Sequence, residues 1–219
     1  MKPVYKTILI IGVILGVLVA GGFSTDWFLK ENFGVGLLGI FNLFKASFEM
    51  SDNSPLMSSF SETELVNALG QQSYESISVS KESSLSSLNS WNNILMDENV
   101  RQGQAYQNVK NEVQGIFGDN YSVYMFSVYK SPSITFKVFE WTINIINGDI
   151  ESFEEGKLLD NYNVKLEVDI SIAEDLLLGR ATAQQMIEWL TSSNPKMRVS
   201  PATELVKIQQ IIPVIAEYL

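Results

Sequence analysis

The chain has 219 residues, a formal net charge of −10 at pH 7, and neither cysteine nor histidine. This length allows one compact domain and a membrane anchor, while the missing residue types exclude disulfides, thiol nucleophiles and the commonest zinc ligand and general base. The acidic balance argues against nucleic acid as a partner, because an acidic surface repels the phosphate backbone.

The first predicted element is a membrane-spanning helix over residues 7–25. Its 19 residues are uncharged and nearly all apolar, and at about 1.5 Å per residue they cover roughly 28 Å, close to the hydrocarbon thickness of a bilayer. Lys2 and Lys6 precede the segment and Asp26 follows it, so the positive-inside rule predicts a cytoplasmic N-terminus. We therefore assign residues 1–25 to a single-pass anchor that leaves the rest of the chain outside the cytoplasm.

This end of the chain also permits a second interpretation. A cleaved secretory signal likewise combines a charged start, an apolar stretch and small residues. The long apolar run and the lack of an A-x-A site at its end favour a retained anchor, and both alternatives export the domain. Gly12 and Gly16 have the G-x-x-x-G spacing of close helix pairs in membranes, which suggests a homo-oligomer formed through the anchor.

Residues 26–103 are expected to connect the anchor to a folded domain. The apolar stretch at residues 33–44 is too short to span a bilayer as a helix, so it either lies at the membrane interface or packs on the domain. The sequence Ser-Glu-Thr-Glu at residues 61–64 predicts a capping box that opens a short helix. Nine of the 18 residues at 73–90 are serine, which fits either a flexible stalk or an amphipathic helix.

Residues 104–219 are predicted to form an α+β domain. From Tyr121 onward apolar residues recur with a period of two, which predicts a twisted, mostly antiparallel sheet of about five strands covered by helices. Asn147-Gly148 is the typical signal of a tight hairpin turn.

Helical spacing returns in the last quarter of the chain. Apolar residues at helical spacing predict helices over residues 172–178 and 181–190. Ser200 is then predicted to cap a last helix, with Pro201 at its first position and an interruption at Pro213.

Three segments carry a resemblance to a known family: residues 139–150, residues 164–181 and residues 196–213. They contribute a hairpin strand, a strand followed by a helix, and a short strand followed by a terminal helix. In this order the chain resembles the sterol carrier protein type two domain, a sterol-binding and lipid-transfer domain, over residues 104–219.

Single positions also match the pattern of that family. Those in register are Asp169, Leu176, Leu177, Gly179, Lys196, Val199, Lys207 and Pro213. Two features depart from it. Ser200-Pro201 stands where the family usually has a glycine turn, and residues 180–195 lack an apolar–glycine pair that is common there.

The resemblance implies a twisted sheet covered by helices around an apolar tunnel that holds a lipid acyl chain or a sterol. Ligand pockets are mostly apolar with a few polar groups. The residues that we expect to line the cavity are Phe126, Phe136, Val138, Trp141, Ile143, Leu177, Met186, Trp189, Ile208 and Ile212. The expected function is a membrane-tethered exported module that binds or transfers lipid or another apolar ligand.

The same apolar residues also suit a solid core, which leaves a second hypothesis open. Under it, the chain is a non-catalytic cell-surface scaffold or protein-interaction domain. The sequence contains no catalytic triad, phosphate-binding loop, dinucleotide fingerprint or metal-ligand spacing, so we assign no catalytic residue, metal or cofactor. The expected partners are the lipid bilayer and a lipid or sterol-like ligand.

Overall fold

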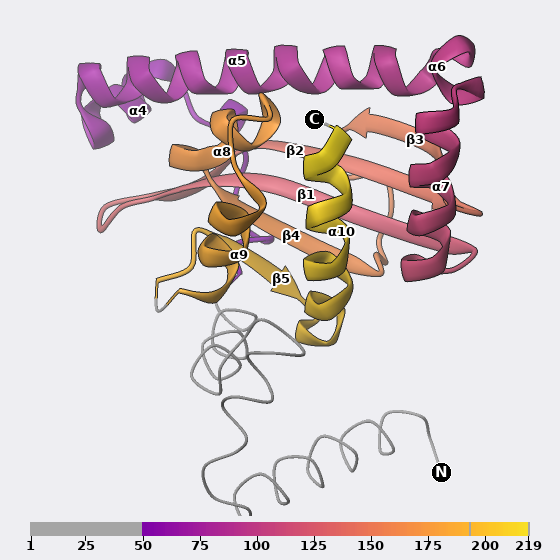
Figure 1. Cartoon of the computed structure of the whole chain (residues 1–219). Coiled ribbons are helices and arrows are strands. Elements are labelled where there is room, and N and C mark those ends of the chain that lie inside the picture. The colour runs from indigo at the N-terminus through magenta and orange to yellow at the C-terminus, as the bar shows by residue number, and fades with distance from the viewer. Residues whose placement is uncertain (1–49, 193, 219) are drawn as a thin grey trace, which may run out of the picture.

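Figure 1 shows the computed structural model of the chain, in which residues 50–192 and 194–218 are described. The predicted anchor at residues 1–25 and the apolar stretch at residues 33–44 lie outside the described residues. Within the described ranges, no helix combines the length and the apolar character needed to cross a membrane.

Five strands form one mixed sheet in the order β3-β2-β1-β4-β5. Their bounds are β1 (Asn120–Lys130), β2 (Thr135–Ile146), β3 (Asp149–Glu155), β4 (Val164–Asp169) and β5 (Met197–Ser200). β1 pairs in parallel with β4, and the three other neighbouring pairs are antiparallel. The α+β class and the five strands are confirmed. The sheet is mixed because the chain crosses from β3 at one edge to β4 on the other side of β1.

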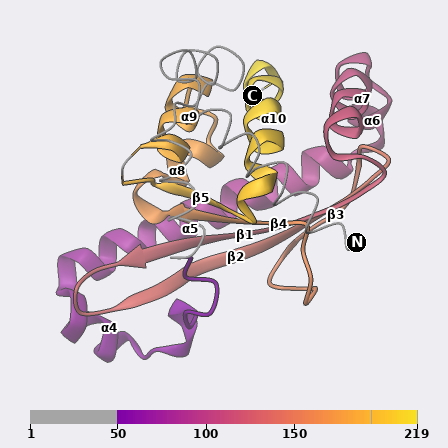
Figure 2. The same ribbon diagram turned by 90° about the horizontal axis from the view of Figure 1, so that it is seen from below.

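Helices precede the sheet, fill the connection between β4 and β5, and follow β5. Their bounds are η1 (Met57–Ser59), α4 (Glu62–Leu69), α5 (Gln71–Met96), α6 (Glu98–Gln102), α7 (Gln104–Phe117), α8 (Ile170–Leu177), α9 (Ala183–Thr191), η2 (Ala202–Glu204) and α10 (Leu205–Tyr218). Figures 1 and 2 show α7, α8, α9 and α10 on one side of the sheet, with the long helix α5 running past their ends. The loop between β3 and β4 projects on the opposite side (Figure 2).

The serine-rich stretch lies in α5, which is the helical alternative that the sequence left open. This helix packs on α8, and Ser84 and Ser87 are buried on its inner side, where small side chains allow a close approach. Trp91 Nε1 donates a hydrogen bond of 2.8 Å to the carbonyl oxygen of Leu177, at the end of α8. Leu88 is fully buried below the helix, so α5 belongs to the same core as the sheet.

The apolar core lies between the helix layer and one face of the sheet. A single cluster combines Met57 from η1, Leu65 from α4, Leu88 from α5, Trp141 from β2 and Ile208 from α10. Helices that precede position 104 therefore contribute to the core of the sheet domain.

Two local predictions are confirmed by their hydrogen bonds and backbone angles. Ser61 Oγ accepts a hydrogen bond from the amide of Glu64, and Glu64 Oε2 accepts one from the amide of Ser61, the reciprocal pattern of a capping box. Asn147 and Gly148 have φ angles of 52° and 75°. Positive φ at both central residues is the conformation that a two-residue hairpin turn of type I′ requires.

The predictions for the last helix need two corrections. Ser200 ends β5 instead of capping a helix, and α10 begins only at Leu205, after η2. α10 also continues past Pro213. A proline removes one helical hydrogen bond, but Ile211 and Ile212 directly before it are buried, and such packing supplies most of a helix's stability in a protein.

Candidate ligand-binding site

The structure gathers nine of the ten predicted cavity residues around one apolar cluster. Buried within it are Phe136, Val138, Trp141, Leu177, Met186, Ile208 and Ile212. Partly buried against it are Ile143 and Trp189. Phe126 is fully buried but lies in a separate cluster with Tyr124 and Val128, on the opposite face of the sheet. The assignment of Phe126 to the same cavity is corrected, because alternate residues of β1 point to opposite faces.

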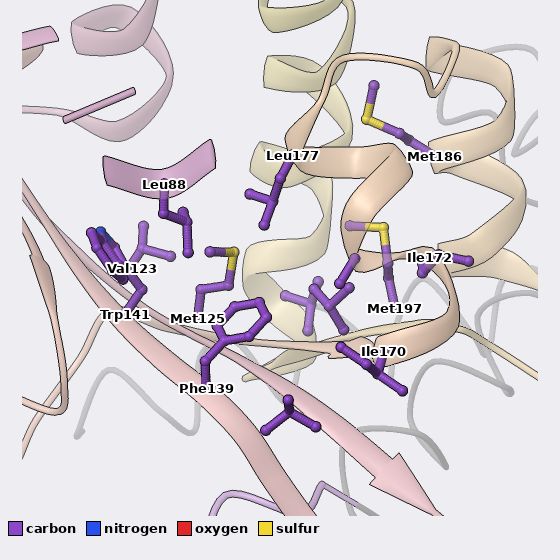
Figure 3. Packing of buried hydrophobic residues seen from close by; sticks show 14 of the residues in the cluster. Leu88, Val123, Met125, Phe139, Trp141, Ile170, Ile172, Leu177, Met186 and Met197 are labelled. Carbon is purple, nitrogen blue, oxygen red and sulfur yellow. The ribbon is translucent and has the colours of Figure 1, made fainter. Parts of the chain in front are cut away.

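The predicted residues pack against their neighbours as a core does. Figure 3 shows Leu88 of α5 pointing toward Trp141 and Val123 of the sheet. The ring of Trp141 lies 5.5 Å from that of Phe153, measured between centroids.

Part of this core contains polar atoms that the protein leaves unpaired. Among the described residues, Trp141 Nε1, Ser84 Oγ and Ser127 Oγ are buried without a hydrogen-bond partner. Buried polar atoms normally have a partner. These three unpaired polar atoms lie on α5 and on the central strands β1 and β2.

A pocket with a volume of about 310 Å³, partly open to solvent, lies between η1, α4 and α5. Its lining consists of Met57, Ser58, Phe60, Glu62, Leu65, Tyr74, Ser78, Lys81 and Glu82. The volume falls at the lower end of the range of ligand pockets, about 300–1,000 Å³. None of the ten predicted residues is in this lining, so the candidate opening lies beside the predicted cavity and not within it.

Local sequence explains how the pocket is built. Gly70 joins α4 to α5 with a φ of 83°, a conformation that favours glycine, so the chain reverses within one residue. Tyr74, Ser78 and Lys81 follow at intervals of four and three residues, which places them on one face of α5. Leu65 of α4 is 2% exposed and fixes the short helix on the core.

Phe60 connects the pocket to the predicted residues. Its ring lies 6.0 Å from that of Phe136 between centroids, and Phe136 in turn stacks on Tyr129 at 5.5 Å. Met57, another lining residue, is 7% exposed and belongs to the main core cluster. The apolar floor of the pocket is therefore continuous with the core between sheet and helices.

The opposite face of the sheet carries a charged network. Glu167 is fully buried there, and its Oε1 accepts hydrogen bonds from Lys130 Nζ at 2.8 Å and from Arg198. Its Oε2 accepts the backbone amide of Ser51 at 2.6 Å. Each oxygen of this carboxylate is thus occupied within the protein, which indicates a structural role rather than that of a general base.

A second group on this face joins Tyr124, Lys137 and Glu140. Lys137 Nζ donates to Glu140 Oε2 at 2.6 Å and to the hydroxyl of Tyr124 at 2.9 Å, and that hydroxyl donates to Glu140 at 2.5 Å. Burial alone would raise the pKa of Glu140, but hydrogen bonds from Lys137 and Tyr124 lower it below its ordinary value. Burial, together with the neighbouring Glu140 carboxylate, raises the pKa of Tyr124. The network therefore favours an ionised Glu140 and a protonated Tyr124 hydroxyl.

Metal binding finds no support in the described ranges, where no group of three or more carboxylates is arranged to hold an ion. Comparison of the sequence with models of protein families finds no match, and a search of curated proteins finds no relative.

Sequence reasoning missed the lining of the pocket. Its residues lie between positions 57 and 82, in the stretch interpreted as a connection. The signal was present in Met57, Phe60 and Leu65, three apolar side chains flanking the capping box. These side chains line a pocket only because the turn at Gly70 sets α5 opposite them, and an apolar pattern does not specify that turn.

Proposed function

We propose that the chain is an exported, membrane-tethered module that binds or transfers lipid or another apolar ligand. The observation that carries the proposal is the pocket between η1, α4 and α5, whose apolar floor is continuous with the core. The resemblance to the sterol carrier protein type two domain and the apolar segment at residues 7–25 support the same function. The segment supplies the tether, and the ligand enters beside Phe60.

Binding of this kind needs no catalytic group. Each methylene moved from water to an apolar site contributes about 0.8 kcal/mol, so burial of part of an acyl chain supplies the affinity. A tether keeps the pocket near the bilayer and raises the effective concentration of lipid without any new contact.

A pocket-filling substitution tests the proposal without removing core contacts. Ser78→Phe puts an aromatic ring into the pocket, whereas Val79→Phe puts the same ring on the solvent side of α5, where Val79 is 64% exposed. The full chain, held in a non-ionic amphipol, is labelled with a long-chain alkanol that carries a diazirine at its methyl end. Tandem mass spectrometry then locates the adducts.

We expect the alkanol to form adducts on peptides that contain Phe60 or Leu65. In the Ser78→Phe variant these peptides should be labelled about tenfold more weakly than in the unaltered chain, which corresponds to a loss of about 1.4 kcal/mol of binding free energy. The Val79→Phe variant should be labelled as strongly as the unaltered chain. Circular dichroism of both variants checks that the fold is retained. Equal labelling of all three proteins would refute the pocket as the ligand site.

The proposed topology has its own test, because the chain contains no cysteine. Asn93 is exposed on α5, so Asn93→Cys introduces a single reporter thiol. A membrane-impermeant maleimide should label this thiol in intact cells to the same extent as in permeabilised cells. Labelling that requires permeabilisation would place the domain inside and overturn export.

One observation favours the alternative, a protein-interaction domain. Val79, Ile94 and Val100 are exposed apolar residues of α5 and α6, and no residue from position 83 to position 96 is charged. If this surface binds a partner protein, Ile94→Glu should disrupt cross-linking to that partner in native membranes. The same variant should leave the alkanol labelling of the pocket unchanged.

A further inference from the structure

The rim of the same pocket carries three charged side chains that have no counter-ion among the described residues. Glu62, Lys81 and Glu82 all belong to its lining. None of the three forms an ion pair with another residue in the part of the chain that the structure describes. Two carboxylates against one ammonium group give the rim a negative balance. Charges of this kind, placed at the mouth of a pocket with a mixed polar and apolar lining, are available to a ligand.

Two aromatic residues share the lining with these charges. Phe60 comes from the turn before α4, and Tyr74 from the first part of α5. The face of an aromatic ring attracts a cation, and aromatic rings beside carboxylates are a recurrent way of recognising quaternary ammonium groups. An anionic headgroup gains nothing from either feature.

The charge of the whole chain acts in the same direction. With a net charge of −10, the protein repels anionic amphiphiles and attracts cationic ones before contact. Lys81 weakens the repulsion of anionic groups at the rim, because its ammonium group can pair with a phosphate. A headgroup that carries both a phosphate and an ammonium group finds a partner for each.

We infer that the pocket selects amphiphiles whose headgroup contains a positively charged nitrogen, either cationic or zwitterionic, over amphiphiles with an anionic headgroup. The inference rests on the proposed function, since it names the class of lipid that the same pocket binds. Glu62 and Glu82 determine the preference, and the apolar floor beneath them binds the chain.

A set of matched probes tests this selectivity. The probes share one alkyl chain with a terminal diazirine and end in trimethylammonium, phosphocholine or carboxylate. The full chain in a non-ionic amphipol is labelled by each probe below its micellar concentration, and adducts at the pocket are counted by mass spectrometry. Glu62→Gln combined with Glu82→Gln removes the rim carboxylates. Glu112→Gln combined with Glu155→Gln is the control, because it removes the same charge at exposed positions outside the pocket.

The trimethylammonium and phosphocholine probes should label the pocket more strongly than the carboxylate probe, by a factor on the order of five, as charge pairs with two exposed carboxylates allow. The rim double variant should lose this preference and still bind the neutral alkanol, while the control double variant keeps it. Equal labelling by all three charged probes, or preference for the carboxylate, would overturn the inference and leave the proposed function standing. Failure of every probe, the alkanol included, would refute the proposed function itself.

Discussion

Replacing Gly148 by alanine measures how closely the β2–β3 hairpin is set against α7. Gly148 has a φ of 75°, and a β-carbon built on it lies 2.1 Å from the carbonyl oxygen of Lys110 and 2.8 Å from Gln114 Cβ. The left-handed backbone costs alanine about 1–2 kcal/mol. Displacing α7 to make room adds about 1–3 kcal/mol, as other overpacked sites do. We therefore expect Gly148→Ala to lower the free energy of unfolding by about 2–5 kcal/mol.

Gly118 provides the matched control for this substitution. It also has a positive φ, 83°, but a β-carbon built there has no neighbour within 4 Å. With a ψ of −161°, Gly118 lies in a backbone region that is nearly restricted to glycine, so Gly118→Ala should cost about 1–3 kcal/mol of backbone strain and displace no neighbour. Guanidinium unfolding of the full chain in amphipol, followed by circular dichroism, gives both values. Equal losses for the two variants would show that the hairpin turn does not contact α7 as closely as the structure has it.

Three further substitutions probe buried or paired charges. Burial alone would raise the pKa of Asp149, but hydrogen bonds from Tyr106 and Lys110 lower it below its ordinary value of 3.8. The ionised carboxylate therefore stabilises the fold above pH 3.8, and this contribution is lost as the pH falls through the lowered pKa. Asp149→Asn should therefore flatten the acid side of a stability–pH profile, and an unchanged acid slope would contradict this. Burial and the adjacent Asp149 raise the pKa of Tyr106 from 10.0 to about 12, so its protonated hydroxyl stabilises the fold below pH 10 and that contribution is lost as the pH rises toward 12. Tyr106→Phe should reduce this alkaline loss, which thermal unfolding between these pH values measures. Glu167→Ala removes the buried carboxylate that Lys130 and Arg198 contact. We expect the free energy of unfolding, measured with denaturant, to fall by about 3–5 kcal/mol. A fall below about 1 kcal/mol would show that these ion pairs contribute no more than surface ion pairs do.

Local chemistry made several elements predictable from the sequence. The capping box at Ser61 and the hairpin turn at Asn147-Gly148 depend on residues that are adjacent in the chain, so the sequence contains the whole interaction. β4 was equally clear, because its alternate residues face the core. The serine-rich stretch was ambiguous because serine suits a linker and also the close contact of α5 with α8.

Tertiary pairing was not predictable in the same way. A period of two identifies strands but does not say which strands pair, so the parallel contact of β1 with β4 had no signal in the pattern. β1 is buried on both faces from Val123 to Val128, which removes the alternation that would have assigned Phe126 to its face. The pocket depends on how α4 turns back on α5 at Gly70, a geometry that no periodicity encodes.

The attachment of residues 51–55 to the sheet has a mechanical consequence. Ser51 donates its amide to Glu167, Asp52 pairs with Lys165, and Lys137 donates its amide to the carbonyl oxygen of Pro55 at 2.8 Å. These contacts attach residues 51–55 to β4 and β2, the two neighbours of the central strand β1. A load applied through the N-terminal end therefore reaches the middle of the sheet before it reaches α4 or α5. Tension applied at residue 51 is therefore carried first by the contacts with β4 and β2.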